Sequence, residues 1–133
     1  MRYLLDTNTC IAAIRQERPV LARLLRCGPD DLAVAVMTVA ELWFGALKSR
    51  DAARGRAVVD AFLAPFAWLP FDDAAADRYA TARHHLEGRG EPIGERDLII
   101  AATALSRGLA VITRNTREFG RVPGLNVEDW STA

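Results

Sequence analysis

Short apolar runs alternate along the chain with segments in which apolar residues recur at helical spacing. The runs predict strands at residues 2–6, 32–36, 67–71, 109–113 and 125–127. Periodicity and breaker residues predict helices at 10–15 and 20–26, and one from 38 up to the charged stretch 49–56. A further helix follows that stretch and runs to about 64, and two more are predicted from 73 to about 86 and at 97–107. Strands that alternate with helices imply right-handed crossovers. The pattern therefore predicts a three-layer α/β/α fold around a mostly parallel sheet of four or five strands.

Length and composition narrow the class of protein. The 133 residues are enough for one domain with its own core, and no linker or internal repeat divides them. Because 17 basic residues balance 17 acidic ones, net charge gives no support for nucleic-acid binding. Cys10 and Cys27 form no Cys-x-x-Cys pair, and Asp6 interrupts the first apolar run. We therefore expect a single domain over residues 1–133, in a reducing cytoplasm and without membrane association.

Three acidic residues stand where an open parallel sheet usually binds its ligand, beyond the carboxyl ends of the strands. Asp6 ends the first predicted strand, and Glu41 lies one turn into the helix after the second. Asp97 begins the helix that leads into the strand ending near Thr113, so it need not lie at the same edge, although a helix that crosses the sheet there can bring it close. Three carboxylates in one cleft would repel one another and raise their pKa values unless cations neutralise them. Hard cations that take oxygen ligands, Mg²⁺ or Mn²⁺, are the expected partners.

Each of these acids also has a purely structural explanation. Asp6 can cap the helix that follows it. Thr38 and Glu41 have the spacing of a capping box, in which a Thr and a Glu three residues later satisfy the first turn of a helix. Asp97 can complement a helix dipole. The residues alone leave both interpretations open.

Four groups of motifs, in order and over nearly the whole chain, resemble the PIN-domain ribonuclease toxins of the VapC type. They are LLDTN at 4–8, TVAEL at 38–42 with Gly45, PIG at 92–94 leading to DLIIAA at 97–102, and TRNTREF at 113–119 with VPGL at 122–125 and EDW at 128–130. The resemblance implies a PIN-like fold and a metal-dependent endoribonuclease, acting on an RNA such as tRNA. It also implies inhibition by a VapB-like antitoxin, a homodimer, and an assembly with the antitoxin that binds operator DNA.

The resemblance assigns roles residue by residue. Asp6, Glu41 and Asp97 match the acidic positions of the family, and Asp6 and Asp97 would hold the metal ion. The fourth acidic position, often Asp, is Asn115 in this chain. Asn115 offers a neutral oxygen ligand or an amide donor to phosphate. A complete four-carboxylate site is therefore in doubt, and Glu95 or Glu118 could partly compensate.

Four further residues are candidates for substrate contacts. Thr113 could donate its hydroxyl to a metal-bound water or to RNA. Asn8 could orient Asp6, or it could simply brace an Asx turn. Arg114 and Arg117 flank the expected cleft and are candidates for binding phosphate, although exposed arginines are more often solvated.

The remaining polar and aromatic residues have structural interpretations. His84 and His85 are adjacent and point about 100° apart on a helix, so they cannot chelate one metal ion together. Trp43, Trp68 and Trp130 are expected in core or interface packing rather than in stacking with bases.

Two other functions remain open at this point. In a haloacid dehalogenase-like phosphatase, Asp6 would be the nucleophile, but that chemistry needs a second Asp where this chain has Asn8. The other alternative is a catalytically weak PIN-fold module that acts, through its partner, in a DNA-bound regulatory complex. Cleavage of RNA by the partner-free protein would distinguish these alternatives.

Overall fold

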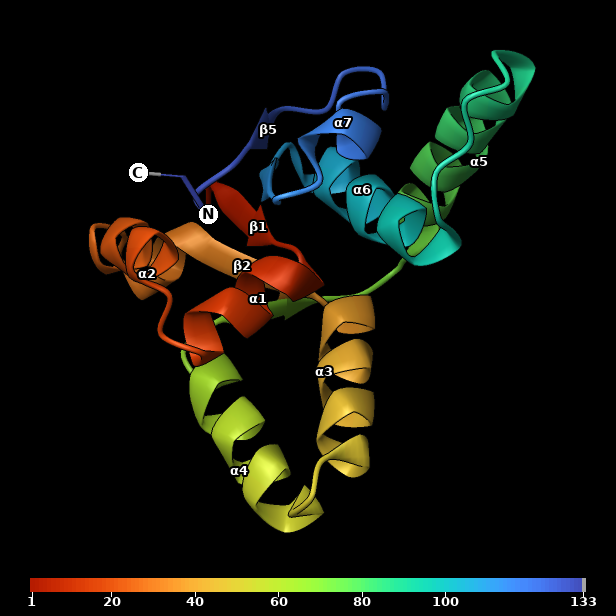
Figure 1. The fold of residues 1–133 in the computed structure, drawn as a ribbon. Coiled ribbons are helices and arrows are strands. Elements are labelled where there is room, and N and C mark those ends of the chain that lie inside the picture. The colour runs from red at the N-terminus through yellow and green to blue at the C-terminus, as the bar shows by residue number, and fades with distance from the viewer. Residues whose placement is uncertain (133) are drawn as a thin grey trace.

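The computed structural model describes residues 1–132 and contains a five-stranded parallel sheet (Figure 1). The strands lie in the order β3-β2-β1-β4-β5, with β1 in the centre. Leu5 of β1 stands in register with Val34 of β2 and Ile112 of β4. The bounds are β1 Tyr3–Leu5, β2 Leu32–Ala35, β3 Ala67–Leu69, β4 Ala110–Ile112 and β5 Val127–Glu128. The predicted sheet is confirmed, and all of its neighbouring strands are parallel.

Helices cover both faces of this sheet, as Figure 1 shows. Leu4 packs with α5, α6 and α7, whereas its neighbour Leu5 packs with α1, α3 and α4 on the opposite face. The alternation of side chains along a strand explains why one short strand belongs to two cores. The helices are α1 Thr7–Ile14, α2 Arg18–Leu25, α3 Val36–Lys48, α4 Ala52–Leu63, α5 Asp73–Gly88, α6 Glu95–Arg107 and α7 Thr116–Phe119, with a 3₁₀ turn at Pro29–Asp31.

The start of α3 differs from the sequence-based expectation. The helix begins at Val36 and its N-cap is Ala35, which makes no side-chain cap. Thr38 is fully buried inside the first turn. The predicted capping box of Thr38 and Glu41 is therefore wrong, because packing on the sheet sets where the helix begins. In the same way α6 starts at Glu95, two residues early, and the short helix α7 lies in a stretch expected to be mostly loop.

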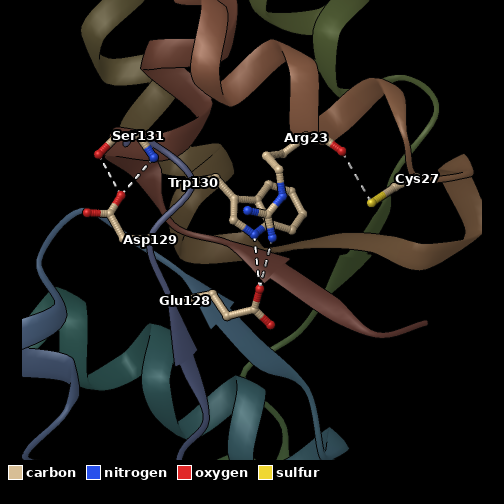
Figure 2. A network of polar contacts seen from close by, with 6 residues as sticks. All are labelled: Arg23, Cys27, Glu128, Asp129, Trp130 and Ser131. Carbon is tan, nitrogen blue, oxygen red and sulfur yellow. Dashed lines mark hydrogen bonds and ion pairs between the residues drawn. The ribbon is translucent and has the colours of Figure 1, made fainter. Parts of the chain in front are cut away.

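The C-terminal segment is fixed to the sheet by polar and aromatic contacts (Figure 2). Trp130 is only 2% exposed and packs edge to face on Tyr3, with ring centroids 5.0 Å apart. Glu128 accepts hydrogen bonds from Trp130 Nε1 at 3.1 Å and from Arg23 at 3.4 Å. The predicted core packing is confirmed for Trp130. In contrast, Trp68 of the edge strand β3 is 42% exposed.

Within residues 1–132, every helix is too short or too polar to cross a membrane.

Candidate active site

Asp6 lies at the carboxyl end of β1 and is 3% exposed. Its Oδ1 accepts a hydrogen bond of 2.8 Å from Thr9 N, so the residue caps α1 as the structural interpretation expects. Burial raises the pKa of Asp6, the hydroxyl of Thr113 and the donors of Thr9 lower it, and the nearby charge of Glu41 raises it further. The carboxylate therefore serves as a helix cap and also faces another acid.

Glu41 lies in the second turn of α3 and is oriented by contacts that are distant in sequence. Thr7 Oγ1 donates to its Oε1 at 2.6 Å, and Arg96 Nη1 donates to its Oε2 at 3.5 Å. Thr7 Oγ1 also lies within hydrogen-bond distance, 3.2 Å, of the buried Thr38 Oγ1. These contacts point the carboxylate toward the end of β1 rather than toward the end of its own helix.

Asp97 comes to the same place from the first turn of α6. Its pKa is raised to about 6, first by burial and then by the charges of Asp6, Glu118 and Glu41, while a hydrogen bond from Asn115 lowers it. Carboxylates repel one another in this way only when they lie close together. The structure thus brings together the three acids that the sequence analysis selected.

The segment after β4 supplies the remaining wall of the site. Thr113 is fully buried, and its Oγ1 accepts a hydrogen bond of 2.9 Å from Asn115 N. Asn115 Nδ2 donates to Glu118 Oε2 at 3.0 Å. Glu118 therefore lies inside the acidic cluster, whereas Glu95 accepts from the Tyr79 hydroxyl at 3.2 Å at the rim.

The other candidates lie further from the acids. Asn8 is exposed, and within residues 1–132 no hydrogen bond joins it to Asp6, whose orientation comes from Thr9 and Thr113. Arg114 forms an ion pair of 2.9 Å with Glu17, and Arg117 is exposed.

Two residues of the site were missed by the sequence analysis. Thr7 and Arg96 both contact Glu41, although they lie 34 and 55 residues away in sequence. The only signal for them was adjacency, since Thr7 follows Asp6 and Arg96 precedes Asp97.

The donor set fits a hard divalent cation. Carboxylate and amide oxygens are the ligands that such ions prefer. The raised pKa of Asp97 reflects its burial first and then the charges of neighbouring acids, and a cation would offset that repulsion. In the described part of the chain, no three Asp, Glu, His or Cys side chains already stand close enough together to enclose an ion.

Comparisons with known proteins agree with this geometry. The PIN domain family matches residues 3–125. The tRNA(fMet)-specific endonuclease VapC of Salmonella typhimurium is 38% identical over 98% of both chains, and ribonuclease VapC2 of Haemophilus influenzae is 35% identical over the same share.

Solved structures give the same result. The DNA-bound VapBC structure from Salmonella typhimurium superposes with a TM-score of 0.93 at 38% identity, covering 98% of each chain. VapBC2 of Rickettsia felis, bound to a fragment of promoter DNA, gives a TM-score of 0.92 at 31% identity, covering 98% of this chain and 99% of that one. The chain therefore belongs to the PIN-domain family and, within it, to the VapC ribonucleases. This membership removes the phosphatase alternative.

Proposed function

We propose that the protein is a metal-dependent endoribonuclease and the toxin of a type II toxin–antitoxin pair. The observation that carries this proposal is the convergence of Asp6, Glu41 and Asp97, from three separate elements, at the carboxyl edge of the sheet. Clustered acids with a raised pKa in a hollow are typical of functional sites. The names of the relatives support RNA as the substrate and the phosphodiester bond as the bond that is cleaved.

Each residue of the site has a distinct proposed role in hydrolysis. Asp6 and Asp97 would hold Mg²⁺ or Mn²⁺, which when bound lowers the pKa of a water molecule and neutralises charge on the phosphate. Thr113 and Thr9 fix the orientation of Asp6. Thr7 holds Glu41 where it can accept a proton from a water molecule near the phosphate. Asn115 carries no charge, so it adds no negative charge around the incoming RNA, and its amide donates to Glu118 at 3.0 Å.

The partner we propose is a VapB-like antitoxin. The two solved relatives described above are VapBC assemblies, and both are bound to DNA, which supports a complex on operator DNA. A groove of about 560 Å³ between α1, α3 and α4 runs up to Glu41, with an apolar floor that includes Ile11, Ile14 and Val59. An antitoxin segment in this groove would cover the acids and stop cleavage.

The proposal also covers the oligomeric state of the protein, its location and its RNA substrate. We infer a homodimer, for which the exposed side chains of Val36, Phe44 and Phe71 offer apolar surface. Both cysteines are free thiols, as is usual in a reducing cytoplasm, where RNA and the antitoxin would be found. The tRNA specificity of a 38% identical relative makes tRNA the first substrate to test.

The decisive experiment uses the purified protein freed of any partner. We expect it to cleave bulk tRNA with Mg²⁺ or Mn²⁺ and to stop when a chelator is added. Sequencing the new RNA ends after a brief pulse of expression would then identify the target. A partner-free, folded protein that leaves RNA intact with either metal would favour the alternative of a catalytically weak module in a DNA-bound complex.

A further inference from the structure

Several acidic side chains of the candidate site lie close enough to repel one another. Asp6, Glu41, Asp97 and Glu118 influence one another, and an RNA phosphate would bring a further negative charge. A bound cation would neutralise part of this charge, but positioning the sugar–phosphate chain usually depends on cationic side chains as well. The site therefore needs a guanidinium or an ammonium group close to the acids.

Arg96 meets this need. It lies in the first turn of α6, directly before Asp97, and its Nη1 is 3.5 Å from Glu41 Oε2. With Glu41, Gly94, Glu95 and Asp97 it lines an open hollow of about 440 Å³ beside the acids. Among the ion pairs of residues 1–132, this is the one that includes an acid of the cluster.

The contact between Arg96 and Glu41 is weak enough to be exchanged. Its length is at the limit of a hydrogen bond, and the Arg96 side chain is 71% exposed. Exposed pairs of this kind contribute little to stability. Arg114, one of the two arginines that the sequence analysis considered for phosphate, is instead held by Glu17 at 2.9 Å.

We propose that Arg96 is the phosphate-binding residue of this site. The inference rests on the proposed ribonuclease function and names the group that receives the RNA backbone. When RNA enters the hollow, the guanidinium leaves Glu41 and donates to two oxygens of a backbone phosphate, the geometry for which its planar fork is suited. The same movement frees Oε2 of Glu41 at the moment when substrate is present.

The test compares Arg96→Gln and Arg96→Lys with wild type and with Arg89→Gln. The control removes one charge from a similarly exposed ion pair, between Arg89 and Glu91, away from the acids. Anisotropy of a short fluorescent RNA, with Ca²⁺ replacing the catalytic metal, measures the Kd across a salt series. Cleavage of bulk tRNA with Mg²⁺ or Mn²⁺ gives kcat and KM, and circular dichroism with urea unfolding confirms that each variant is folded.

We expect Arg96→Gln to raise the Kd and KM at least about threefold and to reduce the salt slope by about 0.7, as loss of one contact to single-stranded phosphate predicts. Arg96→Lys should keep the salt slope but recover only part of the affinity, and Arg89→Gln should match wild type. An unchanged Kd and slope in Arg96→Gln would overturn the inference, even if only kcat fell, because Arg96 would then act only through Glu41.

These readouts separate the inference from the proposed function. If wild type cleaves RNA but binding is independent of Arg96, only the inference fails. If wild type binds RNA through Arg96 without cleaving it, only the nuclease function fails. If wild type does not bind RNA at all, both fail.

Discussion

Acidic side chains meet different surroundings in the C-terminal segment and in the candidate active site. Glu128 faces the guanidinium of Arg23 and the indole N–H of Trp130, so its charge is matched within the chain (Figure 2). Asp97 is instead half-buried beside other carboxylates, and burial followed by their charges raises its pKa to about 6. An acid with its own cation therefore supports the fold, whereas a group of acids with too few cations is typical of a site that binds a partner from outside the chain.

The largest effect should come from removing an acid of the cluster. We expect Asp6→Ala and Asp97→Ala each to reduce RNA cleavage at least about 100-fold and to abolish growth toxicity, because each removes a proposed metal ligand. Both proteins should remain folded by circular dichroism. Glu128→Gln, which alters the matched acid of the C-terminal segment, is the control and should cleave RNA at the wild-type rate. If either Ala variant stays active at saturating metal, the proposed metal site is wrong.

The next effect concerns Glu41. In Glu41→Gln the amide oxygen still accepts the hydrogen bond from Thr7, so stability should change little while cleavage falls about 10-fold or more. Activity assays and urea unfolding of the same preparation measure the two properties together. Full activity in this variant would show that Glu41 is not needed for cleavage. Because α3 has no capping box, the role left for Glu41 would be its contact with α1.

The third prediction adds an acid to the cluster instead of removing one, through the substitution Asn115→Asp. We expect Mn²⁺ to bind about tenfold more tightly, because hard cations bind carboxylate better than amide oxygen. The metal-free variant should be less stable, because its new carboxylate would face Glu118, whose Oε2 lies 3.0 Å from Asn115 Nδ2. Calorimetric titration of Mn²⁺ into both proteins measures the affinity. Equal affinities would place Asn115 outside the coordination shell, with a role in substrate contact or in structure.

The smallest effect concerns the free energy of unfolding, which should rise when an acid of the cluster is neutralised and fall when the paired acid of the C-terminal segment is neutralised. The pKa of Asp97 lies above its usual value of 3.8, so folding favours the protonated form, and the ionised form destabilises the protein above about pH 6. With chelator at neutral pH, Asp97→Asn should raise the free energy of unfolding by about 1 kcal/mol, less than the full shift implies because the side chain is only half-buried.

The same measurement at lower pH supplies the check. The gain from Asp97→Asn should shrink as the pH falls from about 6 toward 3.8, because wild-type Asp97 becomes neutral there. Glu128→Gln should instead lower stability, by less than about 1 kcal/mol, since it loses an exposed pair with Arg23. If Asp97→Asn is less stable than wild type in urea, the charge of Asp97 is better compensated than its raised pKa indicates.

Most strands and helices, and the acids that would lie near the carboxyl edge of the sheet, could be predicted from the sequence. Period-2 and period-3.6 patterns are local properties of the chain, so the central strands and the apolar helix at 97–107 could be predicted from them. Asp6, Glu41 and Asp97 could be selected because parallel strands put their carboxyl ends on one edge.

The surroundings of those acids could not be predicted from local patterns. Thr38 lies buried inside the first turn of α3 instead of capping it, and Glu41 is contacted by Thr7 and Arg96, which lie 34 and 55 residues away in sequence. Glu118 likewise lies near Asp97 because it belongs to α7, a helix of four residues that is too short to show helical periodicity in the sequence. Local patterns do not predict such contacts, because they depend on packing between segments that are distant in sequence and adjacent only in the folded sheet.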